Sequence, residues 1–233
     1  MGITLVNKNA SGTTWDVTAT ATTYTCTLGG TQTAGNLVVV WARNTSTNRS
    51  WASATDSIGG NTWSGAGGDY SANWGSASMQ VGHSVLAVGG AGMVVTVTIS
   101  GGNTGGANAG CAEFSSTTGW PASPLDSVLG NGGTTEATWT SGSITTTQAE
   151  DVIIAFSHDG SSNRTVTKDT GYSDIVIPST TSGIFHDEYK VTSSTFSGTV
   201  AFTPNTTVAA WGMVAASFKN NPATANRRVI MVS

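Results

Sequence analysis

The feature of this sequence that most constrains its fold is an internal repeat. The segment Ala34–Arg49 aligns without a gap with Ala149–Arg164, and in both an apolar run is followed by a Ser- and Asn-rich stretch. Two copies are too few for a solenoid, which needs at least three repeats. We therefore predict two pseudo-repeated halves, at about residues 22–116 and 138–218, each covering an apolar sheet face of the other.

Strand patterns occupy most of the sequence, and glycine-rich turns separate them. Met93–Ile99 alternates apolar residues with threonine, as a half-buried strand does. Leu37–Trp41 and Val152–Phe156 are uninterrupted apolar runs, which suit strands buried on both faces. These patterns predict an all-β fold, a two-sheet antiparallel jelly-roll-like sandwich. Residues 1–219 form one domain in this prediction, and residues 220–233 form a C-terminal arm.

Composition excludes several classes of partner. The net charge is −4, and only 9% of the residues are charged, so a basic surface for nucleic acid is not expected. No apolar run reaches the roughly 18 residues of a membrane span. The N-terminus lacks the pattern of a secretory signal, which favours a virion protein made in the host cytoplasm. A chain from which a signal has been removed is the alternative.

The sequence contains two cysteines, Cys26 and Cys111, both in apolar, strand-like contexts. Two cysteines do not make a disulfide framework, and their spacing matches no zinc motif. In a cytoplasmic product, such residues are expected to be buried free thiols.

Titratable residues give little evidence of catalysis. Adjacent strand residues point to opposite faces, so His186 and Glu188 can share a site, whereas Asp187 points away from them. His83 and His158 are expected to be structural, and Asp56 and Asp169, at similar places in the two halves, are expected to fix turns. The glutamates are scattered, and no nucleophile or phosphate-binding motif is present. We therefore predict no catalytic, cofactor-binding or metal-binding residue, and a protein that is not an enzyme; His186 with Glu188, and calcium, remain the alternatives.

Tryptophan is unusually frequent, with eight residues. Trp41 and Trp211 lie inside apolar strands and are expected in the core. Four others lie beside Gly, Ser and Asn, where an exposed ring could contact a protein or stack on a sugar. These candidate interface or ligand residues are Trp51, Trp63, Trp74 and Trp120. Anchoring of loops at the end of the sandwich is the alternative role for them.

The C-terminal arm carries a polar spacer and then a short apolar tip. Such a segment can add a strand to a neighbouring sheet, and the N-terminal Ile3–Val6 could do the same. Packing of the arm on its own sandwich is the alternative. The candidate capsid-contacting residues are Arg227, Arg228, Val229, Ile230, Met231 and Val232.

Several short motifs resemble a family of jelly-roll-like β-sandwich domains of phage virion structural proteins and bacterial surface proteins. They are Gly35–Val40, Thr55–Trp63, Val95–Ile99, Pro124–Asp126 after Glu113–Phe114, Glu150–Ile153 and a closing strand that ends at Phe218. The likeness spans about residues 22–219. Its motifs describe a fold and imply no active-site residue.

This resemblance, together with the composition, leads us to expect a bacteriophage capsid decoration or cement protein. Its expected partners are the major capsid protein and other copies of itself, as a homotrimer on the capsid surface. The alternative is a carbohydrate- or receptor-binding module of a fibre or adhesin, with a glycan as ligand.

Overall fold

The computed structural model describes residues 2–9, 22–44, 49–65, 71–74, 77–100, 107–159, 165–176, 185–207 and 210–222. Within these ranges the chain forms twenty β-strands and no helix, and every strand pair is antiparallel. The all-β antiparallel sandwich predicted from the sequence is therefore confirmed.

The first half contains a five-stranded sheet and two smaller sheets. The larger sheet has the order β1 (Ile3–Lys8), β10 (Ala107–Ser116), β4 (Leu37–Asn44), β7 (Ala77–Val85) and β6 (Ser71–Trp74). The smaller sheets are β2 (Thr23–Thr27), β9 (Val94–Ile99) and β5 (Trp51–Asp56), and β3 (Thr31–Gln32) with β8 (Gly90–Ala91).

The second half repeats this arrangement strand for strand. Its larger sheet has the order β11 (Leu125–Gly133), β20 (Trp211–Lys219), β14 (Asp151–Asp159), β17 (Phe185–Val191) and β16 (Ser173–Val176). Its smaller sheets are β12 (Trp139–Thr140), β19 (Ala201–Pro204) and β15 (Val166–Thr167), and β13 (Ile144–Thr145) with β18 (Ser197–Gly198). The repeated segments of the sequence thus form the corresponding central strands β4 and β14.

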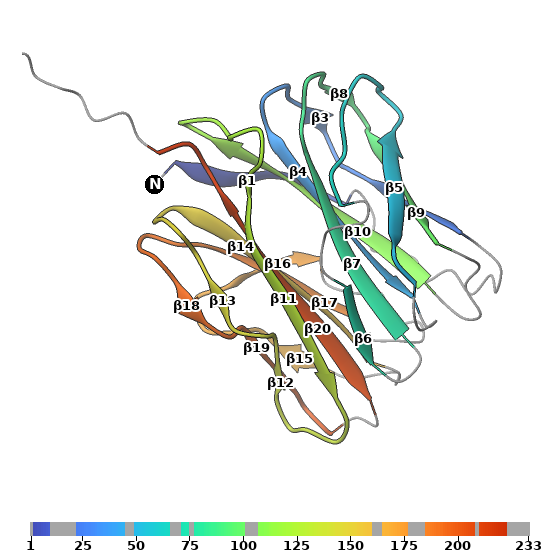
Figure 1. Cartoon of the computed structure of the whole chain (residues 1–233), viewed down its shortest axis with the longest axis vertical. Coiled ribbons are helices and arrows are strands. Elements are labelled where there is room, and N and C mark those ends of the chain that lie inside the picture. Colours follow the sequence, from blue (N-terminus) through green and yellow to red (C-terminus); the bar gives the residue numbers. More distant parts are fainter. Residues whose placement is uncertain are drawn as a thin grey trace, which may run out of the picture.

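The two five-stranded sheets pack face to face, and each carries smaller sheets on its outer side (Figure 1). The sandwich therefore has more layers than the two that the sequence predicted. Leu37, Val39 and Trp41 of β4 join Val152 and Phe156 of β14 in the core between the halves. Because a fully buried side chain of this size contributes about 1.5–3 kcal/mol, this shared core is a large stabilising term.

The alternate residues of the central strands face outward into two further cores. Val38 and Val40 of β4 pack against the β2–β9–β5 sheet, and Ile153 and Ala155 of β14 pack beneath the β12–β19–β15 sheet. All described side chains of β4 and β14 are buried for this reason. The uninterrupted apolar runs in the sequence are thus explained by burial on both faces, as predicted.

One buried ion pair lies inside the interface between the halves. The Arg43 guanidinium on β4 contacts the Asp187 carboxylate on β17, and both side chains are almost fully buried. Trp41 Nε1 donates to Asp187 Oδ2 at 3.3 Å, and Arg43 Nη1 donates to Asn108 Oδ1 at 3.3 Å. Arg43 also lies over the Phe156 ring, 5.6 Å from its centroid. Desolvation lowers the pKa of Arg43, so the carboxylate is needed to keep its charge compensated.

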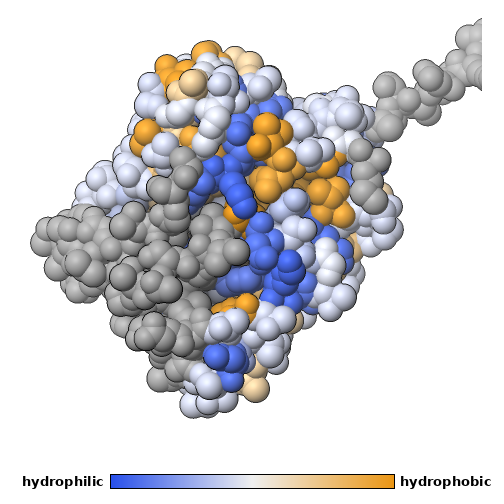
Figure 2. Space-filling view, turned by 180° about the vertical axis from the view of Figure 1, so that it is seen from behind, coloured by the Kyte–Doolittle hydropathy of each residue, from blue (hydrophilic) through white to orange (hydrophobic). Residues whose placement is uncertain are grey.

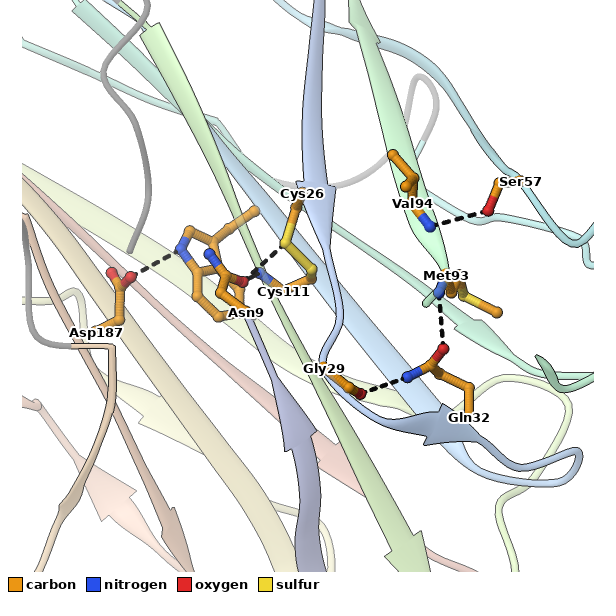
Figure 3. The surroundings of a disulfide bond; sticks show 10 residues. Asn9, Cys26, Gly29, Gln32, Ser57, Met93, Val94, Cys111 and Asp187 are labelled. Atoms are coloured by element: carbon orange, nitrogen blue, oxygen red, sulfur yellow. Dashed lines mark hydrogen bonds between the residues drawn. A yellow bond between two sulfur atoms is a disulfide. The ribbon is translucent and has the colours of Figure 1, made fainter. Parts of the chain in front are cut away.

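The cysteines form a disulfide, and the expectation of free thiols was wrong. Cys26 of β2 and Cys111 of β10 form a bond between the β2–β9–β5 sheet and the larger sheet of the first half, with their Cα atoms 6.1 Å apart (Figure 3). Asn9 Oδ1 accepts a hydrogen bond from the Cys111 N–H at 2.7 Å and lies 2.8 Å from Cys26 Sγ. The sequence did not reveal this pairing because the cysteines are 85 positions apart and meet only when the two sheets pack.

The disulfide predicts a stability difference. We expect the double variant Cys26→Ala/Cys111→Ala to lower the free energy of unfolding by about 2–4 kcal/mol, because the unfolded chain regains the entropy of an open loop. Urea denaturation with and without a reducing agent measures this. The reductant should destabilise the wild type and leave the double variant unchanged; equal sensitivity of the two proteins would contradict the assignment.

The ion pair predicts a double-mutant cycle. Asp187→Leu alone should cost about 3–5 kcal/mol of unfolding free energy, because the buried arginine loses its counter-charge. The double variant Arg43→Met/Asp187→Leu should recover most of that loss, since neither charge then remains inside the apolar interface. Urea denaturation of the four proteins gives the coupling energy. Additive losses in the two single variants would show that the pair does not act as a unit.

Candidate functional site

Of the four tryptophans proposed as ligand contacts, two are buried in the structure. Trp51 is only 4% exposed and Trp120 only 7%, so the exposure expected of these two residues is corrected. Trp63 is half-buried, and its Nε1 donates to Asp56 Oδ2 at 2.9 Å. Trp74 lies in β6, but its side chain is outside the described part of the structure. Among the described indole rings, those in apolar runs (Trp41 and Trp211) and two in polar surroundings (Trp51 and Trp120) are buried alike.

The C-terminal arm residues cannot be placed in the same way. Residues 227–232 lie outside the described residues, so their contact with a capsid stays a prediction.

The aspartates at similar places in the two halves fix local structure. Asp56 Oδ1 accepts hydrogen bonds from the N–H groups of Ile58 at 3.0 Å and Gly59 at 2.8 Å, which confirms its predicted role in a turn. Asp169 instead accepts from the N–H groups of Thr170 at 2.6 Å and Ala201 at 3.0 Å. It therefore ties the β15–β16 connection to the start of β19.

Two of the three histidines lie in the interface between the halves. His83 on β7 meets the Phe218 ring at 5.4 Å between centroids, and burial lowers its pKa to about 4. His158 is fully buried at the end of β14, and burial together with the Arg43 charge lowers its pKa to about 3. Both imidazoles are therefore neutral at physiological pH and enclosed by the sheets.

The third histidine belongs to a polar cluster on the outer face of β17. His186 Nε2 lies 3.5 Å from Glu188 Oε2 and 3.5 Å from Asp174 Oδ1 on β16. Asp187, between them in the sequence, points to the opposite face, as predicted from strand alternation. Glu188 Oε2 also accepts the Asp169 N–H at 3.2 Å. This cluster of Asp169, Tyr172, Asp174, His186 and Glu188 is the candidate polar site.

Burial shapes the electrostatics of the candidate polar site. Burial raises the pKa of Glu188, although the hydrogen bond and charge of His186 act in the opposite direction. Burial and the nearby Glu188 and Asp169 carboxylates also raise the pKa of Tyr172. Glu188 Oε1 and the Tyr172 hydroxyl have no hydrogen-bond partner among the residues that the structure describes. Asp174 is one-third exposed and connects the site to solvent, where it pairs with Lys168 at 3.1 Å.

The side-chain contacts of this site join acidic, basic and aromatic groups. Such groups can exchange protons or hold a cation. Across the ranges that the structure describes, no three His, Cys, Asp or Glu side chains are arranged to hold a metal ion. The same ranges contain no helix with the length and hydropathy of a membrane span.

A second titratable cluster was missed by the sequence reasoning. It joins Asp126 at the start of β11, Asp151 at the start of β14 and Lys219 at the end of β20. The motifs that contain the two aspartates were noted only as fold signatures. Only the pairing of β11 and β14 with β20 brings the three side chains together.

Comparison of the chain with protein-family models, curated proteins and solved structures found no match. The likeness to phage and bacterial surface domains therefore stays a prediction from the motifs.

The depressed pKa of His83 predicts a pH-dependent stability. The folded protein keeps His83 neutral down to about pH 4, whereas the unfolded chain binds a proton near 6.5. The contribution of the neutral imidazole to the free energy of unfolding is therefore fully present above about pH 6.5 and is lost as the pH falls to about 4. As the pH falls over this range, we expect the unfolding free energy of the wild type to decrease by about 2–3 kcal/mol relative to that of His83→Phe.

Urea denaturation at a series of pH values from about 3 to 8 tests this. His158→Phe provides a parallel case whose change should continue to lower pH, since its pKa is about 3. A pH-independent difference for His83→Phe would contradict the prediction.

Proposed function

We propose that this chain is a non-enzymatic virion structural protein, a bacteriophage capsid decoration or cement protein. It binds the outer surface of the assembled shell, with the major capsid protein and further copies of itself, as a homotrimer, as partners. Because it binds the assembled shell and not the separated subunits, it stabilises the shell by mass action.

The observation that carries the proposal is the edge strand β1. The strand order places β1 at the end of the first half's larger sheet, with β10 as its neighbour. Its register with β10 runs from Ile3 to Lys8, and Val6 is 45% exposed on it. An edge strand offers backbone N–H and C=O groups to a strand of another chain, and alternate side chains supply specificity. The Lys8 carbonyl already accepts the Gly29 N–H at 2.9 Å, so the part of the edge that suits strand addition by a capsid subunit is Ile3–Val6.

The rigidity of the sandwich behind β1 also supports this role. A disulfide joins the β2–β9–β5 sheet to the larger sheet of the first half, and a buried ion pair lies between the halves. A rigid edge loses little conformational freedom when it binds. On the face shown in Figure 2, hydrophobic residues form small separate patches beside a band of hydrophilic residues. The hydrophobic patches visible there are small, which fits docking along a local edge.

Electron microscopy of particles from the native source, with the chain located by a labelled antibody, tests the assignment. Density at capsomer junctions supports the decoration role. Density on fibres instead, or binding to glycans with no affinity for shells, would replace the proposal with receptor or sugar binding.

A matched pair of variants tests the docking edge. Val6→Lys places a charge on the edge strand, where it blocks strand addition. Val88→Lys makes the same change in the β7–β8 connection, at a residue that is 44% exposed. In co-sedimentation with shells, we expect Val6→Lys to weaken binding at least about tenfold and Val88→Lys to bind as the wild type does. Equal binding by both variants at unchanged melting temperature would exclude β1 as the docking edge.

A further inference from the structure

The edge strand β1 has a short free segment. In the sheet order of the described residues, β1 has β10 on one side and no strand on the other. Its register with β10 shifts between Leu5 and Asn7, and the Lys8 carbonyl already accepts the Gly29 N–H at 2.9 Å. The free segment is therefore Ile3–Val6, which spans about 13 Å as an extended strand.

This free segment carries none of the residues that usually protect an edge strand. Ile3–Val6 contains neither a charged residue nor a proline, and both residue types discourage pairing with other chains. Its side chain at Val6 is 45% exposed, whereas Ile3 and Leu5 pack at the rim of the core between the halves. Charge repulsion between molecules is weak as well, because only 9% of the residues are charged. Such an edge needs a cover while the chain is free in solution.

The corresponding place in the second half is covered by the chain itself. β1 and β11 are the matching edge strands of the two halves, and each shifts its register once, at Val6 and at Asp126. The side chain of Asp126 is only 1% exposed, and Thr147 and Lys219 hydrogen-bond to it. In the first half, the described residues leave the same place open at Val6.

The last described residues of the chain lie next to the start of β1. The Asn221 N–H donates to the Gly119 carbonyl at 2.9 Å, and the Gly119 N–H donates to the Ser116 carbonyl at 3.2 Å. Ser116 pairs with Ile3, the first residue of β1. In Figure 1 the end of the red segment that follows β20 accordingly lies beside the N-terminus. Residues 223–233 therefore continue from a point close to the free segment.

The sequence that continues from this point has the length and the pattern to cover the edge. Residues 223–228 form a polar spacer of six residues, which reaches about 20 Å when extended. Val229–Val232 is an apolar tip of four residues, the same number as Ile3–Val6. Because side chains alternate along a strand, either register of the tip places two apolar side chains beside Ile3 and Leu5.

We propose that Val229–Val232 adds as a strand to Ile3–Val6 of the same chain and covers this edge until a capsid subunit replaces it. The tip is tethered close to β1, so its effective concentration there is in the millimolar range, far above that of a neighbouring copy in dilute solution. The regulatory consequence rests on the proposed function, in which a capsid subunit binds the same edge. The tip then lowers the apparent affinity for the shell, because only chains with an open edge bind.

Hydrogen exchange of the full-length chain without shells, followed by NMR residue by residue, tests the strand addition. Ile230→Asp/Met231→Asp places a charge on each face of the tip, and Ala223→Asp/Ala225→Asp makes the same change of charge in the spacer. We expect the N–H groups of Ile3–Val6 that do not bond to β10 to exchange at least about tenfold faster in the tip variant than in the wild type. The spacer variant should exchange at the wild-type rate.

Unchanged exchange in β4 establishes that the sandwich of each variant is intact. Equal exchange of Ile3–Val6 in the three proteins would overturn the proposal. Protection that increases with protein concentration would also overturn it, because the tip would then cover the edge of a neighbouring copy.

Co-sedimentation with shells separates this inference from the proposed function. If about nine chains in ten have a covered edge, the tip variant should bind about tenfold more tightly than the wild type, and the spacer variant should bind as the wild type does. A tip variant that binds no more tightly than the wild type would overturn the regulatory role. Binding by none of the three proteins, with the difference in exchange intact, would overturn the proposed function and leave the strand addition standing.

Discussion

The structure depends on two strands that are apolar on both faces. β4 and β14 cannot expose either side to water, so each five-stranded sheet must be covered twice. The inner covering is the other half of the chain, and the outer covering is a small sheet from the same half. The inner core contains side chains of both halves, so neither half can form it alone.

Apolar contact between two sheets is not directional, whereas hydrogen bonds and ion pairs require particular residues to face each other. Trp41 stacks on Phe156, which aligns with it in the repeat, at 5.8 Å between ring centroids. The similarity of the two halves does not extend to the neighbouring strands. Asp187 of β17 accepts from both Trp41 and Arg43, whereas the corresponding residue of β7, Val81, is apolar. An alignment of the sheets that separated Arg43 from Asp187 would leave two buried charges uncompensated.

The candidate polar site and the Asp126–Asp151–Lys219 cluster differ in what the sequence could foretell. Alternation along a strand was enough to place His186 with Glu188 and to separate Asp187 from them. Asp174 and Asp169 join that site through β16 and a connection, which no local pattern indicates. The second cluster unites three strands distant in sequence, and it was found only when their pairing was known.

The sequence by itself determined the all-β class, the repeat, the double-sided burial of β4 and β14, and the turn at Asp56. These are consequences of side-chain periodicity and local hydrogen bonding, which act over a few residues. The tertiary structure alone decided that Cys26 meets Cys111, that Trp51 and Trp120 are buried, and that Lys219 contacts Asp126. Such contacts depend on which sheets stack and in what register, and that is set by long-range packing, which leaves no mark in the neighbouring sequence.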